Sequence, residues 1–303
     1  MDEIWQENPD ALIAASKHQS GSFKKVDGGY IGSGISTFAS GCLHADWVIV
    51  GGAPVDDSDE ILGPVLPIKD VVIMDSWHSI GLNGTGSHHI KYDDIFVPDH
   101  RSRSPNKPPS GGIIDGPMYR TTGLGVPFGL STVLVGLASG ALEIFADKMK
   151  SRRSRAGVSV ADFQSLQMRI GEAAAEIDAA RCLIRSHLKD LMITLEKAPP
   201  ASGSGGFEHG VWPDQAGMGI ENHHWPKRGT GDDSAHIALA NSHAAILAHN
   251  AIERLSYAAG ASDLSMEDDL LRCLRDSTAG TRQYGINWDI ARTRAGRSFL
   301  GLS

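Results

Sequence analysis

The pattern of apolar residues changes once along this chain, and that change constrains its fold most strongly. In the first hundred residues or so, the apolar residues form short runs rich in Val and Ile, such as Ala45–Val50 and Val71–Met74, which are typical of buried strands. From Pro127 onward they recur every three or four residues, which is typical of helices that bury one face. Between the two patterns, the Pro-, Ser- and Gly-rich stretch at 101–112 indicates a linker.

The two patterns predict an α+β protein of two domains. Residues 1–105 are expected to form an antiparallel β-barrel or sandwich, because short strand-like runs alternate with turn signals such as Asp27-Gly28. Residues 113–303 are expected to form an antiparallel four-helix bundle. Its helices are predicted at 127–151, 161–196, 235–259 and 266–294. The long connection at 197–233 is interpreted either as a lid or subunit-interface loop, or as a flexible insert.

Composition narrows the class of protein. The fractions of hydrophobic (41%) and charged (21%) residues are typical of a soluble globular protein. A net charge of −8 gives no support for nucleic-acid binding. No apolar run approaches a membrane span, and the acidic N-terminus lacks the features of a secretory signal. Three widely separated cysteines indicate a reducing environment, so a cytoplasmic protein is expected.

Metal binding is not expected. The histidines of the long connection are His209, His223 and His224. No cysteine or carboxylate stands near them at the spacing of a metal site.

Three sequence strings carry the functional signal. The first, DSWHSIGLNGTGSHHIKYDDIFVPDHR at 75–101, has three glycines within six residues, which indicates positive φ angles or a close backbone approach. Spacing alone is equally compatible with an ordinary β-turn. The second, at 28–52, reads GGYIGSGISTFASGCLHADWVIVGG. The third comprises Leu274-Arg275-Asp276 and the closing segment Gly296–Leu302.

In this order, the strings resemble the acyl-CoA dehydrogenase superfamily. The most similar branch is the reduced-flavin-dependent monooxygenases, the oxygenase components of two-component aromatic hydroxylases of the p-hydroxyphenylacetate hydroxylase type. The resemblance covers most of the chain except 196–232. It implies reduced FMN or FAD from a separate flavin reductase, and an aromatic or polycyclic substrate from a biosynthetic or degradative pathway. It also implies a homodimer or homotetramer formed through the bundle.

The resemblance implies roles for individual residues. Ser40 matches the hydroxyl residue beside flavin N5, while Trp77 matches the wall of the flavin and substrate cavity. The implied cofactor-binding residues are Phe38, Ala39, Ser40, Gly41, Thr85, Gly86, Ser87, Arg155 and Gln164. Taken without the resemblance, the hydroxyl side chains among them are equally interpreted as stabilising turns.

Among three neighbouring arginines, Arg152, Arg153 and Arg155, we favour Arg155 for a cofactor phosphate, because a guanidinium donates to phosphate in bidentate fashion. The alternative is that these charges complement the dipole at a helix C-terminus.

Two departures from the family pattern set further expectations. The family's N-terminal helical domain has no counterpart ahead of Trp5. We therefore expect that another polypeptide supplies it, that the site is open or remodelled, or that the sequence is a fragment. The family's histidine after the Arg-Asp pair is replaced by Thr281-Arg282-Gln283-Tyr284. Arg282 or Tyr284 is expected to substitute for it electrostatically, so the predicted catalytic residues are Ser40, Trp77 and Arg282.

Two other functions were weighed. A dehydrogenase needs a carboxylate base, and none of Glu253, Glu267, Asp268 and Asp269 stands in a matching context. The remaining alternative is a repurposed scaffold without flavin chemistry. Such a scaffold would bind a small molecule, catalyse a cofactor-free rearrangement or cyclisation, or serve as a subunit of a hetero-oligomer.

Overall fold

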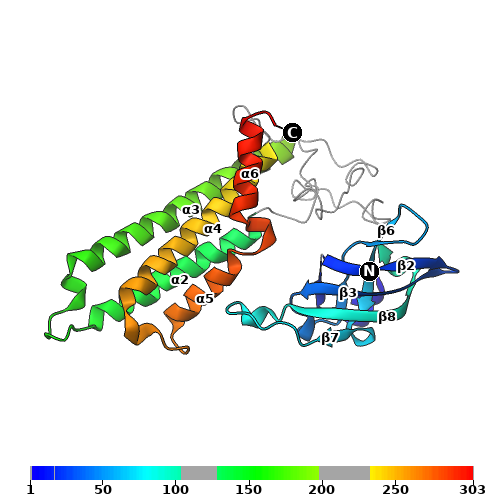
Figure 1. Ribbon diagram of the computed structural model, residues 1–303, viewed down its shortest axis with the longest axis horizontal. Coiled ribbons are helices and arrows are strands. Elements are labelled where there is room, and N and C mark those ends of the chain that lie inside the picture. The colour runs from blue at the N-terminus through cyan, green and yellow to red at the C-terminus, as the bar shows by residue number, and fades with distance from the viewer. Residues whose placement is uncertain (1, 17, 104–127, 198–232, 303) are drawn as a thin grey trace. The chain divides into compact units, whose positions relative to one another are not determined.

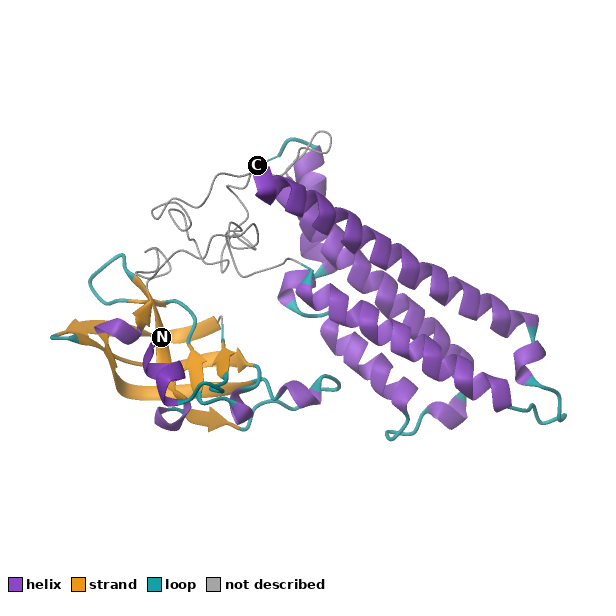
Figure 2. Cartoon of the chain, turned by 180° about the vertical axis from the view of Figure 1, so that it is seen from behind, coloured by secondary structure: helices purple, strands orange, loops and turns teal. Residues whose placement is uncertain are grey.

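The computed structural model describes residues 2–16, 18–103, 128–197 and 233–302 (Figure 1). These residues form two compact units. The strand unit comprises described residues up to 79 and from 83 to 103, and the helical unit comprises 80–82 and the described residues from 128 onward. Figure 2 shows that the strands belong to the first unit and the long helices to the second. Residues 104–112 of the predicted linker and 198–232 of the predicted long connection lie outside the described residues, whereas residues 101–103 of the linker are described and belong to the strand unit.

The strand unit contains two sheets. The described strands are β1 (Ile13–Ala15), β2 (His18–Val26), β3 (Gly29–Ala39), β4 (Trp47–Ile49), β5 (Ala53–Pro54), β6 (Ile61–Pro67), β7 (Val72–Met74), β8 (His88–Pro98) and β9 (Ser102–Arg103). One sheet has the order β2-β3-β8-β7, and the other has the order β1-β4-β6-β5 with β9 paired to β6. A short helix, α1 (Asp2–Glu7), precedes them.

The prediction of purely antiparallel pairing is wrong for one pair of strands. β1 and β4 are parallel, whereas the other strand pairs described are antiparallel. The chain passes through the β2–β3 hairpin of the other sheet between them, and such a crossover allows parallel pairing. The predicted hairpin at Asp27-Gly28 is confirmed, because Val26 pairs with Gly29 across it.

The helical unit contains three long helices, α2 (Gly129–Ser151), α3 (Gln164–Lys197) and α4 (Asp233–Ala259). The single helix predicted at 266–294 is wrong, because the structure has α5 (Asp269–Gly280) and α6 (Trp288–Phe299) there. Polar side chains cause the break. Gln283 Oε1 accepts from the Gly285 amide at 2.5 Å, and Asn287 Oδ1 accepts from two α6 amides, each at 3.1 Å.

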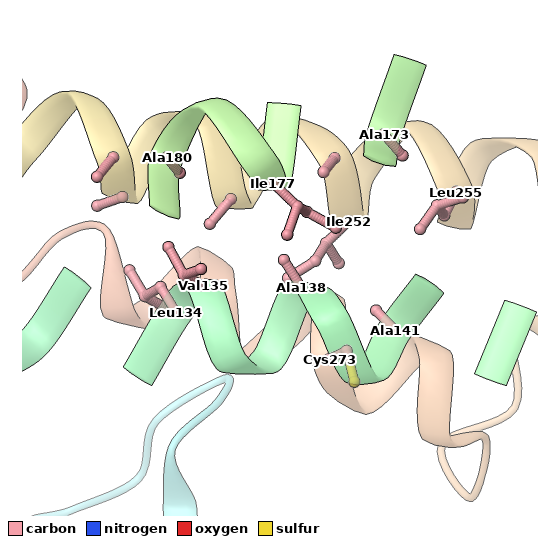
Figure 3. Close-up of a cluster of buried hydrophobic side chains, with 14 of the residues drawn as sticks. Leu134, Val135, Ala138, Ala141, Ala173, Ile177, Ala180, Ile252, Leu255 and Cys273 are labelled. Carbon is pink, nitrogen blue, oxygen red and sulfur yellow. The ribbon is translucent and has the colours of Figure 1, made fainter. Parts of the chain in front are cut away.

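Small residues let the long helices pack closely. Ala138 and Ala141 of α2 face Ala173 and Ala180 of α3, among larger side chains such as Ile177 (Figure 3). The fully buried members of this core from α2 and α4 also include Phe145, Ala244, Ala248, Ala251, Ile252 and Leu255. Alanine at these positions leaves room for neighbouring backbones, and the larger side chains fill the remaining space.

Helix α2 buries only part of its apolar side chains. Leu134 is buried in the bundle core, whereas Leu130 is 45% exposed. By length and composition alone, α2 is also apolar enough to cross a membrane, although the sequence suggested no such run. The face that carries Leu134 continues through Phe145 and Met149 and packs in the bundle core, and we therefore describe α2 as a bundle helix.

Candidate functional site

Pairing between β3 and β8 brings three hydroxyl groups together. Ala39, the last residue of β3, lies opposite His88, the first residue of β8. Ser40 and Ser87 therefore meet, and their Oγ atoms are 2.8 Å apart. Thr85 Oγ1 lies 2.7 Å from Ser87 Oγ. Ser87 is only 5% exposed, whereas Ser40 is exposed, so the hydrogen-bonded hydroxyls lead from the interior to the surface.

The backbone beside Ser40 is open. Gly41 donates its amide to Thr85 O at 2.8 Å, which joins the turn after β3 to the turn before β8. Gly41 has a φ of 82°, a left-handed conformation that favours glycine. A Cβ at this position would meet no atom within 4 Å. A planar group can therefore approach the Gly41 backbone next to the Ser40 hydroxyl.

Two aromatic side chains lie near this turn. Phe38 adopts a φ of 61°, which is strained for a residue with a Cβ, and it follows a register shift in the β3–β8 pairing. Its side chain is 55% exposed. The ring meets Trp77 edge-on with centroids 6.3 Å apart, and His89 edge-on at 5.4 Å. The backbone irregularity thus presents an aromatic surface beside the hydroxyl groups.

Two histidines that the sequence analysis did not single out support these aromatic residues. His88 Nδ1 accepts from the amides of Ser76 and Trp77, each at 3.2 Å. His89 Nδ1 accepts from the Phe38 amide at 3.4 Å. These bonds explain why β7 ends at Met74, because the amides of Ser76 and Trp77 bond to a side chain instead of a neighbouring strand. The available signal was two histidines directly after the glycine-rich turn.

The remaining predicted residues belong to both units. The Ala39 side chain is fully buried in the core of the strand unit, so only its backbone is available to a cofactor. Gly86 lies in the turn with a φ of 49°. Arg155 and Gln164 are exposed residues of the helical unit, just before and at the start of α3. Arg282 is an exposed residue that follows α5.

Arg282 lies in the electrostatic environment of a half-buried histidine that the sequence analysis also missed. His249 of α4 hydrogen-bonds through Nδ1 to Ser277 Oγ at 3.0 Å. Burial lowers the pKa of His249, and the positive charge of Arg282 lowers it further, while Glu253 acts in the opposite direction. The neutral imidazole is therefore favoured at this position.

Two cavities in the described part of the helical unit lie apart from the hydroxyl groups along the chain. One, of about 400 Å³, is lined by side chains that include His187, His236, His243 and Trp288. The other, of about 440 Å³, includes Arg152 and Arg169 but neither Arg155 nor Gln164. Arg152 Nη1 donates to Ala259 O at 2.6 Å and to Asp263 Oδ2 at 2.8 Å.

Across the described ranges, no cluster of three or more His, Cys, Asp or Glu residues is placed to hold a metal ion.

Comparison with known proteins identifies the family of this chain. The family model for the acyl-CoA dehydrogenase C-terminal domain matches residues 128–202. The oxygenase component of the FADH(2)-dependent resorcinol hydroxylase of Rhizobium sp. (strain MTP-10005) is 31% identical, over 99% of this chain and 71% of that protein. The oxygenase component of p-hydroxyphenylacetate 3-hydroxylase of Acinetobacter baumannii is 28% identical, over 99% of this chain and 67% of that protein.

Solved structures share the fold. The HsaA monooxygenase from M. tuberculosis superimposes with a TM-score of 0.73 at 26% identity, over 100% of this chain and 74% of that one. XiaF from Streptomyces sp. superimposes with a TM-score of 0.74 at 23% identity, over 100% and 72% of the two chains, which shows a common fold. The fold class is that of the acyl-CoA dehydrogenases. The chain belongs to the flavin-dependent oxygenase components within that superfamily, as the sequence strings indicated.

Proposed function

We propose that this protein is the oxygenase component of a two-component flavin-dependent monooxygenase. It takes reduced FMN or FAD from a separate flavin reductase and hydroxylates or oxygenates an aromatic small molecule. The names of the relatives, an FADH(2)-dependent resorcinol hydroxylase and a p-hydroxyphenylacetate 3-hydroxylase, support both the cofactor and the substrate class. When bound, reduced flavin supplies the reaction with dioxygen, and the protein supplies binding, orientation and exclusion of water.

The observation that carries the proposal is the hydroxyl group of Ser40 beside open glycine backbone and the exposed ring of Phe38, which meets Trp77. The ring system of a reduced flavin has an apolar dimethylbenzene end and carries polar nitrogen atoms and carbonyl groups along the rest of its edge. The Gly41 backbone, which has no Cβ, admits such a ring, and the aromatic pair of Phe38 and Trp77 offers it an apolar neighbour. Ser40 Oγ provides the polar partner. The residues present therefore fit the cofactor.

Because the three hydroxyls are hydrogen-bonded to one another, the Ser40 hydroxyl can either donate a hydrogen bond to a ligand or accept one from it. In each of the two hydroxyl pairs, either oxygen can be the donor. If Thr85 donates to Ser87 and Ser87 donates to Ser40, the Ser40 proton is free to point at a ring nitrogen. If all three hydroxyls rotate, Ser40 donates inward and its oxygen accepts instead. The same three residues can thus serve a nitrogen that carries a proton or one that does not.

Phosphate recognition is assigned to the start of α3. Arg155 lies exposed in the turn before this helix, which the adjacent Gly157 closes with a φ of 76°. Gln164 is the first residue of a 34-residue helix, whose N-terminal end carries partial positive charge. The Arg155 guanidinium is a suitable partner for a flavin phosphate, because it can donate in bidentate fashion.

The proposal extends to assembly and location. Apolar side chains along and just after α6 are exposed, with Ile290 at 43%, Phe299 at 55% and Leu300 at 75%. Exposed apolar side chains on the bundle support association into a homodimer or homotetramer. The three cysteines are free thiols, of which Cys42 and Cys273 are buried, in keeping with a cytoplasmic protein. Light scattering tests the assembly, and a monodisperse monomer would contradict it.

The test of the activity is turnover with ¹⁸O₂. The full chain is combined with a flavin reductase, NADH and a panel of phenols, and the products are analysed by mass spectrometry. One ¹⁸O atom is expected in a hydroxylated product, and omission of the chain is expected to abolish it. A chain that binds reduced flavin but gives no labelled product from any phenol would contradict the proposed substrate class.

A further inference from the structure

Side chains close the base of the loop that carries the candidate flavin residues. β7 and β8 pair as far as Met74 opposite His89, and the loop 75–87 lies between these strands. Beyond that pair, His88 Nδ1 accepts from the Ser76 and Trp77 amides, each at 3.2 Å. In return, Ser76 Oγ accepts from the His89 amide at 2.8 Å. Both ends of the loop are thus tied together by one imidazole and one hydroxyl.

The two bonds to His88 define which ring nitrogen is the hydrogen-bond acceptor. Two N–H groups point at Nδ1, so this nitrogen carries a lone pair, and the proton of the neutral ring is on Nε2. The Asp75 carboxylate also faces Nδ1, but Oδ1 is 3.9 Å away, which is too far for a hydrogen bond. The Asp75 side chain is 83% exposed, whereas that of His88 is 13% exposed. His88 is therefore a buried acceptor rather than an ionic partner.

We propose that His88 is a positioning residue of the flavin site, acting through the lone pair of Nδ1. It fixes the backbone of Trp77, whose indole packs against the exposed ring of Phe38. It also follows Ser87 directly in the chain, and Ser87 holds the Ser40 hydroxyl at 2.8 Å. One imidazole thus fixes an aromatic wall and the hydroxyl groups in the same relative position. This inference rests on the proposed function, because it assigns the fixed geometry to binding of reduced flavin.

A pair of substitutions isolates the Nδ1 position. In His88→Asn, the amide oxygen occupies the place of Nδ1, two bonds from Cβ, and can accept the same two N–H groups. In His88→Gln, the polar atoms lie one bond further out, at the level of Nε2, and the Nδ1 position becomes a carbon. His78→Asn is the matched control, because His78 lies in the same loop with its side chain 72% exposed.

Two measurements on the full chain read out these variants. The first is anaerobic titration with reduced FMN and reduced FAD. His88→Asn and His78→Asn are expected to bind reduced flavin as the wild type does. His88→Gln is expected to raise the Kd for reduced flavin about tenfold, because its loop would adopt the binding conformation only about one tenth of the time. The second is hydrogen exchange of the Ser76 and Trp77 amides, which is expected to accelerate in His88→Gln alone. In addition, ¹⁵N NMR of the wild type is expected to show an unprotonated Nδ1 on His88.

The outcomes separate this inference from the proposed function. Equal Kd values for His88→Gln and the wild type, or equal losses in His88→Asn and His88→Gln, would overturn the role of the Nδ1 lone pair. A protonated Nδ1 would overturn it as well. If the wild type binds neither reduced flavin, the proposed function fails and so does the role of His88 in flavin binding. The amide exchange of the two variants then decides whether His88 fixes the loop.

Discussion

Replacing Gly81 with alanine is expected to disrupt the packing of residues 80–82 against helix α5. A Cβ at position 81 would lie 2.2 Å from Arg275 O and 2.4 Å from Arg275 C, and both are backbone atoms that cannot rotate away. The next residue, Leu82, has a φ of 57° and donates its amide to Asp276 Oδ1 at 2.6 Å. The glycine is therefore required for close approach, and the Asp276 carboxylate holds the segment that it admits.

The size of the effect follows from these contacts. If the segment stays in place, the overlap costs about 1–3 kcal/mol in strain. If it moves away, the protein loses the charge-assisted bond between Leu82 and Asp276, which contributes about 1.5–3 kcal/mol. The two routes give a similar loss, and the chain will follow the less costly one. We therefore expect Gly81→Ala to lower the free energy of unfolding of the helical unit by about 1.5–3 kcal/mol.

Urea unfolding monitored by circular dichroism at a helical wavelength measures this loss. Gly84→Ala is the matched control in the same loop, because a Cβ there would meet no atom within 4 Å. The control is expected to change stability by less than about 0.5 kcal/mol. Equal unfolding midpoints and slopes for the two variants would refute the argument, since they would show that residues 80–82 do not pack on Arg275 and Asp276.

Three further predictions concern single side chains. Ser87→Ala removes the hydroxyl between Ser40 and Thr85. It should lower the free energy of unfolding by about 1–2 kcal/mol and weaken the binding of reduced flavin. An unchanged Kd for reduced flavin in anaerobic titration would contradict this prediction. Asp268 accepts from the Leu270 amide at 2.8 Å and caps α5, so Asp268→Ala should cost about 1 kcal/mol in urea unfolding at neutral pH. Burial opposes ionisation of Asp268, but Lys148 and the cap amides outweigh burial and lower the pKa of Asp268 below the ordinary 3.8. The loss of stability caused by Asp268→Ala should therefore shrink as the pH falls below that value. A loss that does not depend on pH would be inconsistent with an ionised cap. Burial is the main cause that lowers the pKa of His249, so the wild type should lose stability as the pH falls below the ordinary 6.5. His249→Gln should lack that loss. Identical slopes of unfolding free energy against pH for the variant and the wild type would exclude a contribution of His249 to the pH dependence.

Short sequence patterns were sufficient to predict the helices and turns that depend on residues close together in the chain. The Asp27-Gly28 hairpin is fixed by the conformational preferences of two adjacent residues, and the three long helices follow from apolar spacing. The break between α5 and α6 was missed because apolar spacing continues through it. Only the side-chain caps at Gln283 and Asn287 interrupt the helix, and such caps compete with helical bonding in a way that spacing does not reveal.

The candidate site depended on contacts between distant parts of the sequence. Ser40 and Ser87 are 47 residues apart and meet only because β3 and β8 pair with Ala39 opposite His88. Family resemblance pointed to these residues, but spacing alone left them as turn stabilisers. The role of His88 was not predictable, since it requires the pairing of β7 with β8 to bring the Ser76 and Trp77 amides to its ring.

The most direct test of the central claim is an anaerobic titration of the full chain with reduced FMN and reduced FAD, comparing wild type with Ser40→Ala. Ser58→Ala is the control, because its hydroxyl bonds only locally, to Val55 O and the Glu60 amide. The account predicts saturable binding of at least one reduced flavin by the wild type and the control, with weaker binding by Ser40→Ala. Binding of neither flavin, or equal binding by all three proteins, would contradict a reduced-flavin site at the Ser40 hydroxyl.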